Sequence, residues 1–500
     1  MNENDLNPVK SEKDEVQNPP QTFLGKVKHL GPGIIIAGSI VGSGELIATT
    51  LVGAKAGFIL MWLIILGCVI KVFTQVEFGR HTMIWSKTPL KALDSIPGPR
   101  FKVKWILWYW LIMMMFISTQ QGGILGGIGQ ALTMVVPVTE DAKLYNKQVS
   151  EKIRFKVNQA VKAEDQELKD EPQVTAKRPV DVKVYAIIIA IMTSIILYLG
   201  RFSLIQWFST IMVFGFTIVT FVNLVMLQSD PKWAISLSDI ASGLSFSFSE
   251  GGELNMTSLA IAFSAFGLIG VGASELIMYP YWCLEKGYAK FTGKRDDSPE
   301  WIARAQGWIK VMKMDAWASM IVYTFSTLAF YLMGATILHR VGLLPENGDL
   351  VATLGEMYVP VFGESAQLVF VIGAISVLYS TFFVAAAGSA RVLADGLGLF
   401  GLIANDEASR MRWSRIMSGL WPLGALSLYL FFTSPISMVL WSGIAHSLML
   451  PMVGYAALHF RYKKTMDELK PSKLWDVFLW LSVVGMFVTG FWTAYSKLFS

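Results

Sequence analysis

Long apolar stretches recur along the chain and constrain its fold more than any other feature. Each is long enough to cross roughly 30 Å of hydrocarbon as a helix. A composition of 53% hydrophobic and only 16% charged residues excludes an ordinary soluble domain. We therefore predict an all-α integral membrane protein with eleven transmembrane helices in a lipid bilayer. The expected spans are residues 30–56, 57–80, 103–136, 182–199, 202–226, 257–282, 315–338, 364–389, 414–432, 435–460 and 474–497.

One seven-residue motif occurs twice, at an offset of 230 residues. Five of its seven positions are identical, and the other two exchange one small residue for another. Each copy lies in the first span of a predicted five-span unit. Because each unit has an odd number of spans, the two units insert with opposite orientation and form an inverted repeat. The copies are Val41-Gly42-Ser43-Gly44-Glu45-Leu46-Ile47 and Val271-Gly272-Ala273-Ser274-Glu275-Leu276-Ile277.

The predicted domain organisation follows from this 5+5 repeat, to which the last span is an addition. The first residues mix Lys, Glu, Asp, Asn and Pro and lack the apolar core of a signal peptide, which is typical of a disordered tail. The expected parts are a cytoplasmic tail (1–29), a first unit (30–226) with an outer insert (138–183), a second unit (257–460) and an eleventh helix (474–500).

Positive charge predicts the orientation in the membrane. Lysine and arginine concentrate in the N-terminal tail and in every second loop, whereas the alternate loops hold Lys55, Lys232, Arg340 and Lys497. Because cytoplasmic loops carry the excess of these residues, we predict a multi-pass cell-membrane protein with a cytoplasmic N-terminus and an external C-terminus. The insert has balanced charges and suits amphipathic helices on a solvated outer surface, which we favour over a partner site.

The two copies of the motif place a glutamate beside small residues within an apolar span. The run Gly42-Ser43-Gly44 favours local unwinding, and unwound backbone in a membrane is tolerated where it lines a cavity. There, freed carbonyls near Gly42 and Gly272 can coordinate a cation beside Glu45 and Glu275. The alternative is that the small residues form a close helix interface and the glutamates pair with lysines.

Two converging carboxylates suit two kinds of chemistry. They supply the hard oxygen ligands that Mg²⁺, Mn²⁺ or Ca²⁺ prefer. They can also carry protons, because burial and mutual repulsion favour their protonated forms. Both Glu45 and Glu275 are therefore predicted metal ligands and predicted proton carriers. Further candidates for the substrate cavity are Ser43 and Ser274 beside the breaks, and His446 and Met449, which share a face of span 10.

Other short motifs lie within or next to the spans: Gly31-Pro32-Gly33, Gly57 and Trp62 near the first break, Gly267-Leu268-Ile269-Gly270 before the second, Ser380-Thr381, Ala387-Gly388 and Asp395-Gly396 around span 8, and Ser447-Leu448-Met449-Leu450-Pro451 in span 10. Together they resemble the Nramp (natural resistance-associated macrophage protein) divalent-metal transporters over most of the chain. The resemblance implies eleven or twelve spans and a leucine-transporter-type inverted-repeat fold.

The metal-site positions depart from the pattern of that family. Its first-span motif is Asp-Pro-Gly-Asn, where this chain has Gly42-Ser43-Gly44-Glu45. Its Ala and Met of span 6 align with Gly272 and Glu275, although Met278 offers a shifted register. Its cation-facing Gln of span 10 aligns with Met449. The resemblance therefore implies a divergent branch in which a carboxylate replaces a soft thioether, which favours Mg²⁺, Mn²⁺ or Ca²⁺ over softer metals.

These observations predict a secondary active transporter of divalent metal cations that works by alternating access, with protons as the candidate coupling ion. The alternative is a symporter of an organic cation or amino acid with the same fold, in which the glutamates bind an amine. A third hypothesis is a sensor or scaffold that uses residues 140–181. The sequence shows no nucleotide-binding loop, zinc motif or nucleophile motif, so we expect no enzyme, no resident cofactor and no nucleic-acid partner. We expect a monomer.

Overall fold

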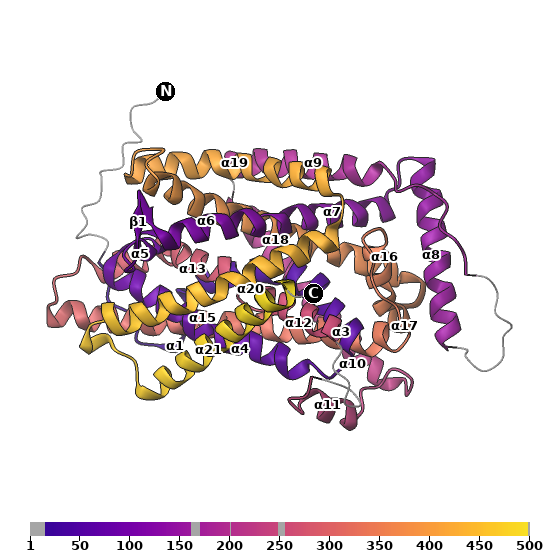
Figure 1. The fold of residues 1–500 in the computed structure, drawn as a ribbon, viewed down its shortest axis with the longest axis horizontal. Helices are drawn as coiled ribbons and strands as arrows, with labels where there is room; N and C mark the ends of the chain where they lie inside the picture. The colour runs from indigo at the N-terminus through magenta and orange to yellow at the C-terminus, as the bar shows by residue number, and fades with distance from the viewer. Residues whose placement is uncertain (1–15, 162–170, 201, 249–255, 499–500) are drawn as a thin grey trace.

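The computed structural model describes residues 16–161, 171–200, 202–248 and 256–498 (Figure 1). Within these residues, ten helical segments are long and apolar enough to cross a membrane. A bent pair, Pro32–Ile40 and Gly44–Ala56, makes an eleventh span with an angle of 43° between its parts. The prediction of an all-α protein with eleven spans is confirmed.

The first half of the chain supplies five spans and the insert. Its only strands among the described residues are β1 and β2, a short antiparallel pair in which Arg100 faces Lys104. The elements are α1 (Phe23–Lys28), α2 (Pro32–Ile40), η2 (Gly44–Thr49), α3 (Thr50–Ala56), α4 (Met61–Trp85), α5 (Pro89–Leu93), β1 (Arg100–Phe101), β2 (Val103–Lys104), α6 (Trp105–Ile117), α7 (Thr119–Val135), α8 (Glu140–Val161), α9 (Asp181–Tyr198), α10 (Phe202–Met226), η3 (Leu227–Ser229) and α11 (Leu237–Gly243).

The second half supplies six spans, of which the first is again broken. The helix that contains the seventh span of the chain begins at Pro299, before the predicted start of that span at residue 315. The elements are α12 (Met256–Leu268), α13 (Ala273–Lys286), α14 (Tyr288–Thr292), α15 (Pro299–Met333), η4 (Gly334–His339), α16 (Leu350–Gly355), η5 (Glu356–Tyr358), α17 (Val359–Phe362), η6 (Gly363–Ser365), α18 (Ala366–Leu399), α19 (Glu407–Phe432), α20 (Pro435–His459), η7 (Phe460–Lys464), η8 (Asp467–Leu469) and α21 (Lys473–Leu498).

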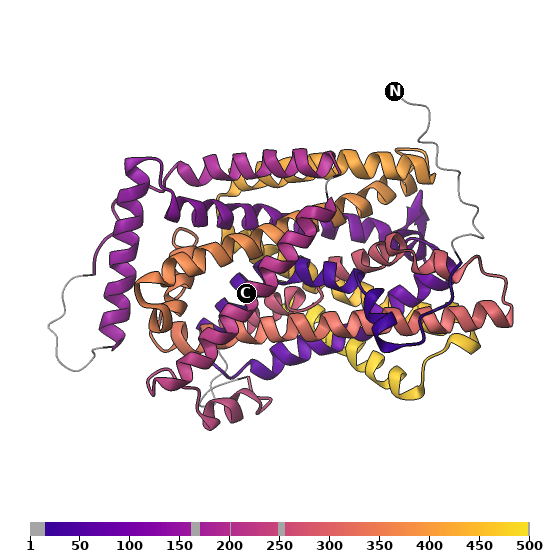
Figure 2. The same cartoon turned by 180° about the vertical axis from the view of Figure 1, so that it is seen from behind.

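The broken spans lie in the middle of the bundle and other helices surround them. Figures 1 and 2 show α9 and α19 packed together along one edge, while α21 lies at the opposite edge against α20 and α4. In the most apolar part of Ala262–Lys286 all residues are buried, compared with 28% in α9 and in α19. The outer helices instead expose apolar side chains, such as Ile188 and Ile195 of α9 and Phe491 of α21. This distribution suits a lipid-facing rim around a buried centre.

The insert forms a helix that lies across the ends of the spans (Figures 1 and 2). The Tyr145 hydroxyl donates a hydrogen bond to the Gly348 carbonyl at 3.2 Å, and Asn146 Nδ2 donates to the Thr133 carbonyl at 3.0 Å. A cavity of about 200 Å³ lies beneath α8 and includes Tyr145 and Asn146 in its wall. The predicted helix of the insert is therefore confirmed for Glu140–Val161.

The described part of the predicted disordered tail, residues 16–29, is ordered. The backbone N–H of Gln17 donates to the Phe291 carbonyl at 3.0 Å, and Trp308 Nε1 donates to the Gln17 carbonyl at 2.9 Å. Here the structure differs from the prediction, because hydrogen bonds from the Gln17 backbone to the Phe291 carbonyl of α14 and the Trp308 side chain of α15 hold a segment whose composition alone favours disorder. Residues 1–15 lie outside the described residues.

Asp315 joins both broken spans at one end of the bundle. Its carboxylate accepts hydrogen bonds from the backbone N–H groups of Gly31 (2.8 Å) and Gly33 (2.5 Å) at the start of α2. The same carboxylate accepts a bond from the Tyr279 hydroxyl of α13 at 3.2 Å. A negative charge at a helix N-terminus is favourable, and here it also satisfies buried N–H groups. Asp315 therefore positions α2 relative to α13 and α15.

Replacing this carboxylate should destabilise the fold more than removing an ordinary helix cap. We expect Asp315→Ala to cost about 2–4 kcal/mol, because it leaves buried donors without partners. The matched control is Asp406→Ala, which removes the exposed cap of α19 and should cost about 1 kcal/mol. Thermal unfolding of the purified proteins measures both changes, and equal losses would contradict a special role for Asp315.

Candidate functional site

The first break lies between α2 and η2 and is closed on one side by α18. A Cβ atom at Gly42 would lie 1.8 Å from Thr381 Oγ1, so only glycine fits here. Thr381 Oγ1 donates to the carbonyl oxygens of Gly38 and Val41, each at 3.3 Å. Ser380 Oγ also donates to the Gly38 carbonyl, at 3.4 Å. Side chains of α18 thus satisfy the carbonyls that the end of α2 leaves free.

Glu45 is completely buried at the start of η2. Its Oε2 accepts a hydrogen bond from the Gly42 backbone N–H at 3.4 Å. Its Oε1 accepts a bond from Thr327 Oγ1 of α15 at 3.1 Å. The carboxylate therefore folds back over the unwound residues, and two donors hold it in this position.

The second break lies between α12 and α13. Gly270 has φ +62°, a left-handed conformation that favours glycine. A Cβ atom at Gly272 would lie 2.4 Å from Glu275 Oε2, so the carboxylate uses the space that a side chain would fill. Glu275 is 7% exposed, and its Oε2 accepts a bond from Ser274 Oγ at 2.9 Å. His446 Nδ1 lies 4.0 Å from the same oxygen.

His446 of α20 binds the start of α13 through its ring. Its Nδ1 accepts a hydrogen bond from the Ala273 backbone N–H at 3.0 Å, so the proton of the neutral ring is on Nε2. Nε2 is buried and has no hydrogen-bond partner among the described residues. Met449, three residues later, is also buried. The predicted face of span 10 therefore meets the second break at His446.

A cavity of about 10 Å³ adjoins Glu275 and has room for about one water molecule. Glu275 and Met278 both line it, because residues three apart share a helix face. Gln120 and Gln121 of α7 form another part of its wall. Glu45 is not among the described residues that line it.

Ser43 connects the first break to the wall of this cavity. Gln120 Nε2 donates to Ser43 Oγ at 2.9 Å, and Ser442 Oγ donates to Gln120 Oε1 at 3.2 Å. A chain of polar groups therefore runs from span 1 through α7 to α20.

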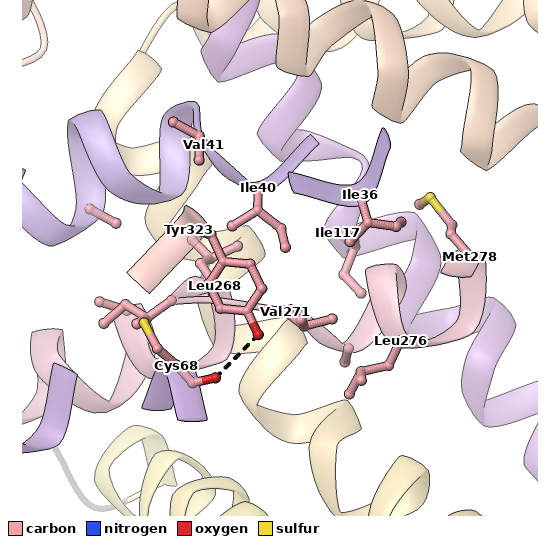
Figure 3. Close-up of a cluster of buried hydrophobic side chains, with 14 of the residues drawn as sticks. Ile36, Ile40, Val41, Cys68, Ile117, Leu268, Val271, Leu276, Met278 and Tyr323 are labelled. Carbon is pink, nitrogen blue, oxygen red and sulfur yellow. Dashed lines mark hydrogen bonds between the residues drawn. The ribbon is translucent and has the colours of Figure 1, made fainter. Parts of the chain in front are cut away.

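Apolar side chains fill the space around the two breaks (Figure 3). Ile40 and Val41 come from the first break, and Leu268 and Val271 come from the second. The Tyr323 ring lies among them, and its hydroxyl donates to the Cys68 carbonyl at 3.2 Å. Such packing excludes water and strengthens the polar contacts of the breaks.

Two residues at the breaks were missed as site candidates in the sequence. Lys71 of α4 donates to the carbonyl oxygens of Phe266 and Ile269, each at 2.6 Å. Thr327 bonds Glu45, as described above. A lysine within an apolar span is itself a signal of function, and its position could have identified Lys71. A threonine in α15 carries no comparable signal.

The centre offers carboxylate, hydroxyl, amide and carbonyl oxygens, which are ligands for hard cations. Among the described residues, no group of three or more His, Cys, Asp or Glu side chains is placed to hold a metal ion. An ion bound here would therefore need hydroxyl or carbonyl oxygens in addition to a carboxylate. Among the described residues, neither Glu45 nor Glu275 forms an ion pair with lysine or arginine. The alternative in which the glutamates of the repeated motif pair with lysines is therefore not what the structure shows.

Comparison with known proteins identifies the family. The sequence profile of the Nramp family, described as natural resistance-associated macrophage protein-like, matches residues 175–496, more than half of the chain. The chain belongs to the Nramp family. The resemblance seen in its short motifs is confirmed, and this Nramp protein is a transporter and not an enzyme.

Similar proteins extend the match over nearly the whole Nramp chain. An uncharacterised protein of Pasteurella multocida (strain Pm70) is 23% identical over 476 residues, which are 94% of this chain and 92% of that protein. A manganese transporter of Eremococcus coleocola, crystallised with an aromatic bis-isothiourea substituted compound, has a TM-score of 0.60 at 12% identity and covers 99% and 91% of the two chains. A nucleobase-cation-symport-1 family transporter has a TM-score of 0.50 at 14% identity, with 99% and 95% covered. The leucine-transporter-type fold is thus confirmed.

The close approach at the first break gives a testable prediction. Gly42→Ala should destabilise the protein by about 2–3 kcal/mol, because the new methyl group overlaps Thr381. The matched control is Gly127→Ala in α7, whose added Cβ meets only the end of the Leu378 side chain at 3.1 Å and should cost less than about 1 kcal/mol. Thermal unfolding of both variants measures the two losses of stability. Equal losses would contradict the close approach of Gly42 to Thr381.

Proposed function

We propose that this Nramp protein is a secondary active transporter that moves a divalent metal cation across the lipid bilayer by alternating access. In the proposal, Glu45 and Glu275 ligate the ion together with backbone carbonyls near Gly42 and Gly272. Ser43, Ser274, His446 and Met449 are further candidates for its cavity. Family membership and the fold it shares with a manganese transporter support this function.

The observation that carries the assignment of the site is the equivalent burial of two glutamates. Glu45 is 0% exposed and Glu275 is 7% exposed, and each lies in the first turn of the helical segment that follows a break. Both accept hydrogen bonds from neutral donors, and among the described residues neither forms an ion pair with lysine or arginine. A carboxylate is costly to bury in a membrane protein, so a buried one is a candidate member of a substrate or ion pathway.

The identity of the ion follows from the same donors. Oxygen ligands favour Mg²⁺, Mn²⁺ or Ca²⁺, and the manganese transport named for the Eremococcus protein adds weight to Mn²⁺. Protons are the proposed coupling ion, and Glu45 and Glu275 are their proposed carriers.

The distribution of lysine and arginine supports a cytoplasmic N-terminus and an external C-terminus. Because one chain supplies both breaks, we propose that the monomer is the working unit. The repeats keep their proposed bounds, 30–226 and 257–460, with the tail at 1–29 and the eleventh helix at 474–500.

Neutralising the two glutamates should abolish metal binding. We expect Glu45→Gln, Glu275→Gln and the double variant to weaken binding of the preferred ion about 30-fold or more, because each loses a buried charge that faces the ion. Isothermal titration of the purified protein with Mg²⁺, Mn²⁺, Ca²⁺ and Cd²⁺ measures this loss and ranks hard against soft ions. Glu285→Gln is the matched control, since Glu285 lies on the same helix as Glu275 but is exposed and paired with Arg391.

Other outcomes would select other functions. Wild-type metal uptake by the double variant would rule out the glutamates as ligands. Binding of an organic cation or amino acid, with no response to the four metals, would select the alternative symporter. A function that survives both substitutions but requires residues 140–181 would select the sensor or scaffold.

A further inference from the structure

Lys71 is a fully buried ammonium group in the middle of the bundle. It lies on α4, and among the described residues no carboxylate forms an ion pair with it. Its Nζ instead donates to the carbonyl oxygens of Phe266 and Ile269 at 2.6 Å, and it lies 4.8 Å from the centre of the Phe266 ring. A buried charge held only by carbonyls and an aromatic face needs a functional explanation.

The two carbonyls lie where α12 stops. α12 ends at Leu268, so Phe266 and Ile269 are among the residues whose carbonyls have lost their helical partners. The C-terminal end of a helix also carries a partial negative charge. The lysine therefore occupies a place that favours a cation, directly before the break that leads to Glu275. Its charge is also within electrostatic range of Glu45 and Glu275.

The first break provides an internal comparison. α2 ends at Ile40, and the carbonyls of Gly38 and Val41 stand in the same positions relative to that end as those of Phe266 and Ile269 relative to the end of α12. At the first break the neutral hydroxyl of Thr381 fills the space between the carbonyls. At the second break the side-chain nitrogen of Lys71 fills it. The equivalent carbonyls of the two halves therefore accept hydrogen bonds from different groups, a hydroxyl in the first half and an amine nitrogen in the second.

We propose that Lys71 is a resident cation that takes the place of a dissociable monovalent cation at the second break. The ammonium group fixes the end of α12 and thereby positions α13 and Glu275. Lys71 is a positioning residue in this role, and because it is present no monovalent metal ion needs to bind at the end of α12. The predicted effect of Lys71 on transport rests on the proposed function. The predicted binding of a cation at the end of α12 does not depend on that function.

Chemical rescue tests the proposal. Lys71→Ala removes the charge and opens space beside two unpaired carbonyls, so the variant should be less stable and should take up Mn²⁺ about tenfold more slowly or worse. Na⁺, methylammonium or n-butylammonium, added singly, should restore thermal stability and uptake in this variant and leave the wild type unchanged. Tetramethylammonium has no N–H donor and should not restore either. Lys55→Ala, which removes a lysine from α3, is the matched control and should not respond to these ions.

Two results would overturn the proposal. One is a Lys71→Ala protein with wild-type stability and uptake in the absence of all these ions. The other is a folded but impaired variant that none of the ions restores. If the alanine variant does not fold, Lys71→Arg and Lys71→Met decide: a stable arginine variant beside an unstable methionine variant supports a required cation, and equal behaviour contradicts it. Thermal stability is measured without divalent metal. Restoration of the stability of Lys71→Ala by these ions would therefore support the role of Lys71 even if the protein does not transport a metal.

Discussion

The structure depends on one constraint, that backbone carbonyls and N–H groups within a membrane must find partners inside the protein. Two spans are broken at its centre, and each break frees such groups. The hydroxyl of Thr381 and the ammonium of Lys71 bond the freed carbonyls, and Asp315 bonds the N–H groups at the start of α2. These partners lie on the surrounding helices α18, α4 and α15, so the packing of those helices against the broken spans stabilises the breaks.

Much of the fold could be predicted from the sequence because its main signal is local. A run of apolar residues identifies a span whatever its neighbours are, and the repeated motif located both breaks. The first turns of α15 were not predicted, because Pro299 begins a helix whose first turns are polar and carry no membrane signal. The order of residues 16–29 was missed because it depends on bonds to Phe291 and Trp308, far away in the sequence.

The candidate site was only partly predictable for the same reason. Glu45 and Glu275 stand out as charges within apolar spans, and their burial agrees with that signal. Their partners do not stand out: Thr327 lies 282 residues from Glu45, and His446 approaches Glu275 from another span. The two alignment registers for span 6 placed either Glu275 or Met278 at the site, whereas both residues line the cavity. Contacts between distant spans require three-dimensional coordinates.

The shared carboxylate of Asp315 has a mechanical consequence. It holds the beginning of α2 and the Tyr279 hydroxyl of α13 at once, so neither half-helix can swing away alone without breaking buried hydrogen bonds. The two half-helices on this side of the breaks are therefore tied to each other through α15, and the glycines of the breaks are the flexible positions about which such a unit could bend. Any gate at this end of the bundle opens both broken spans together or opens neither.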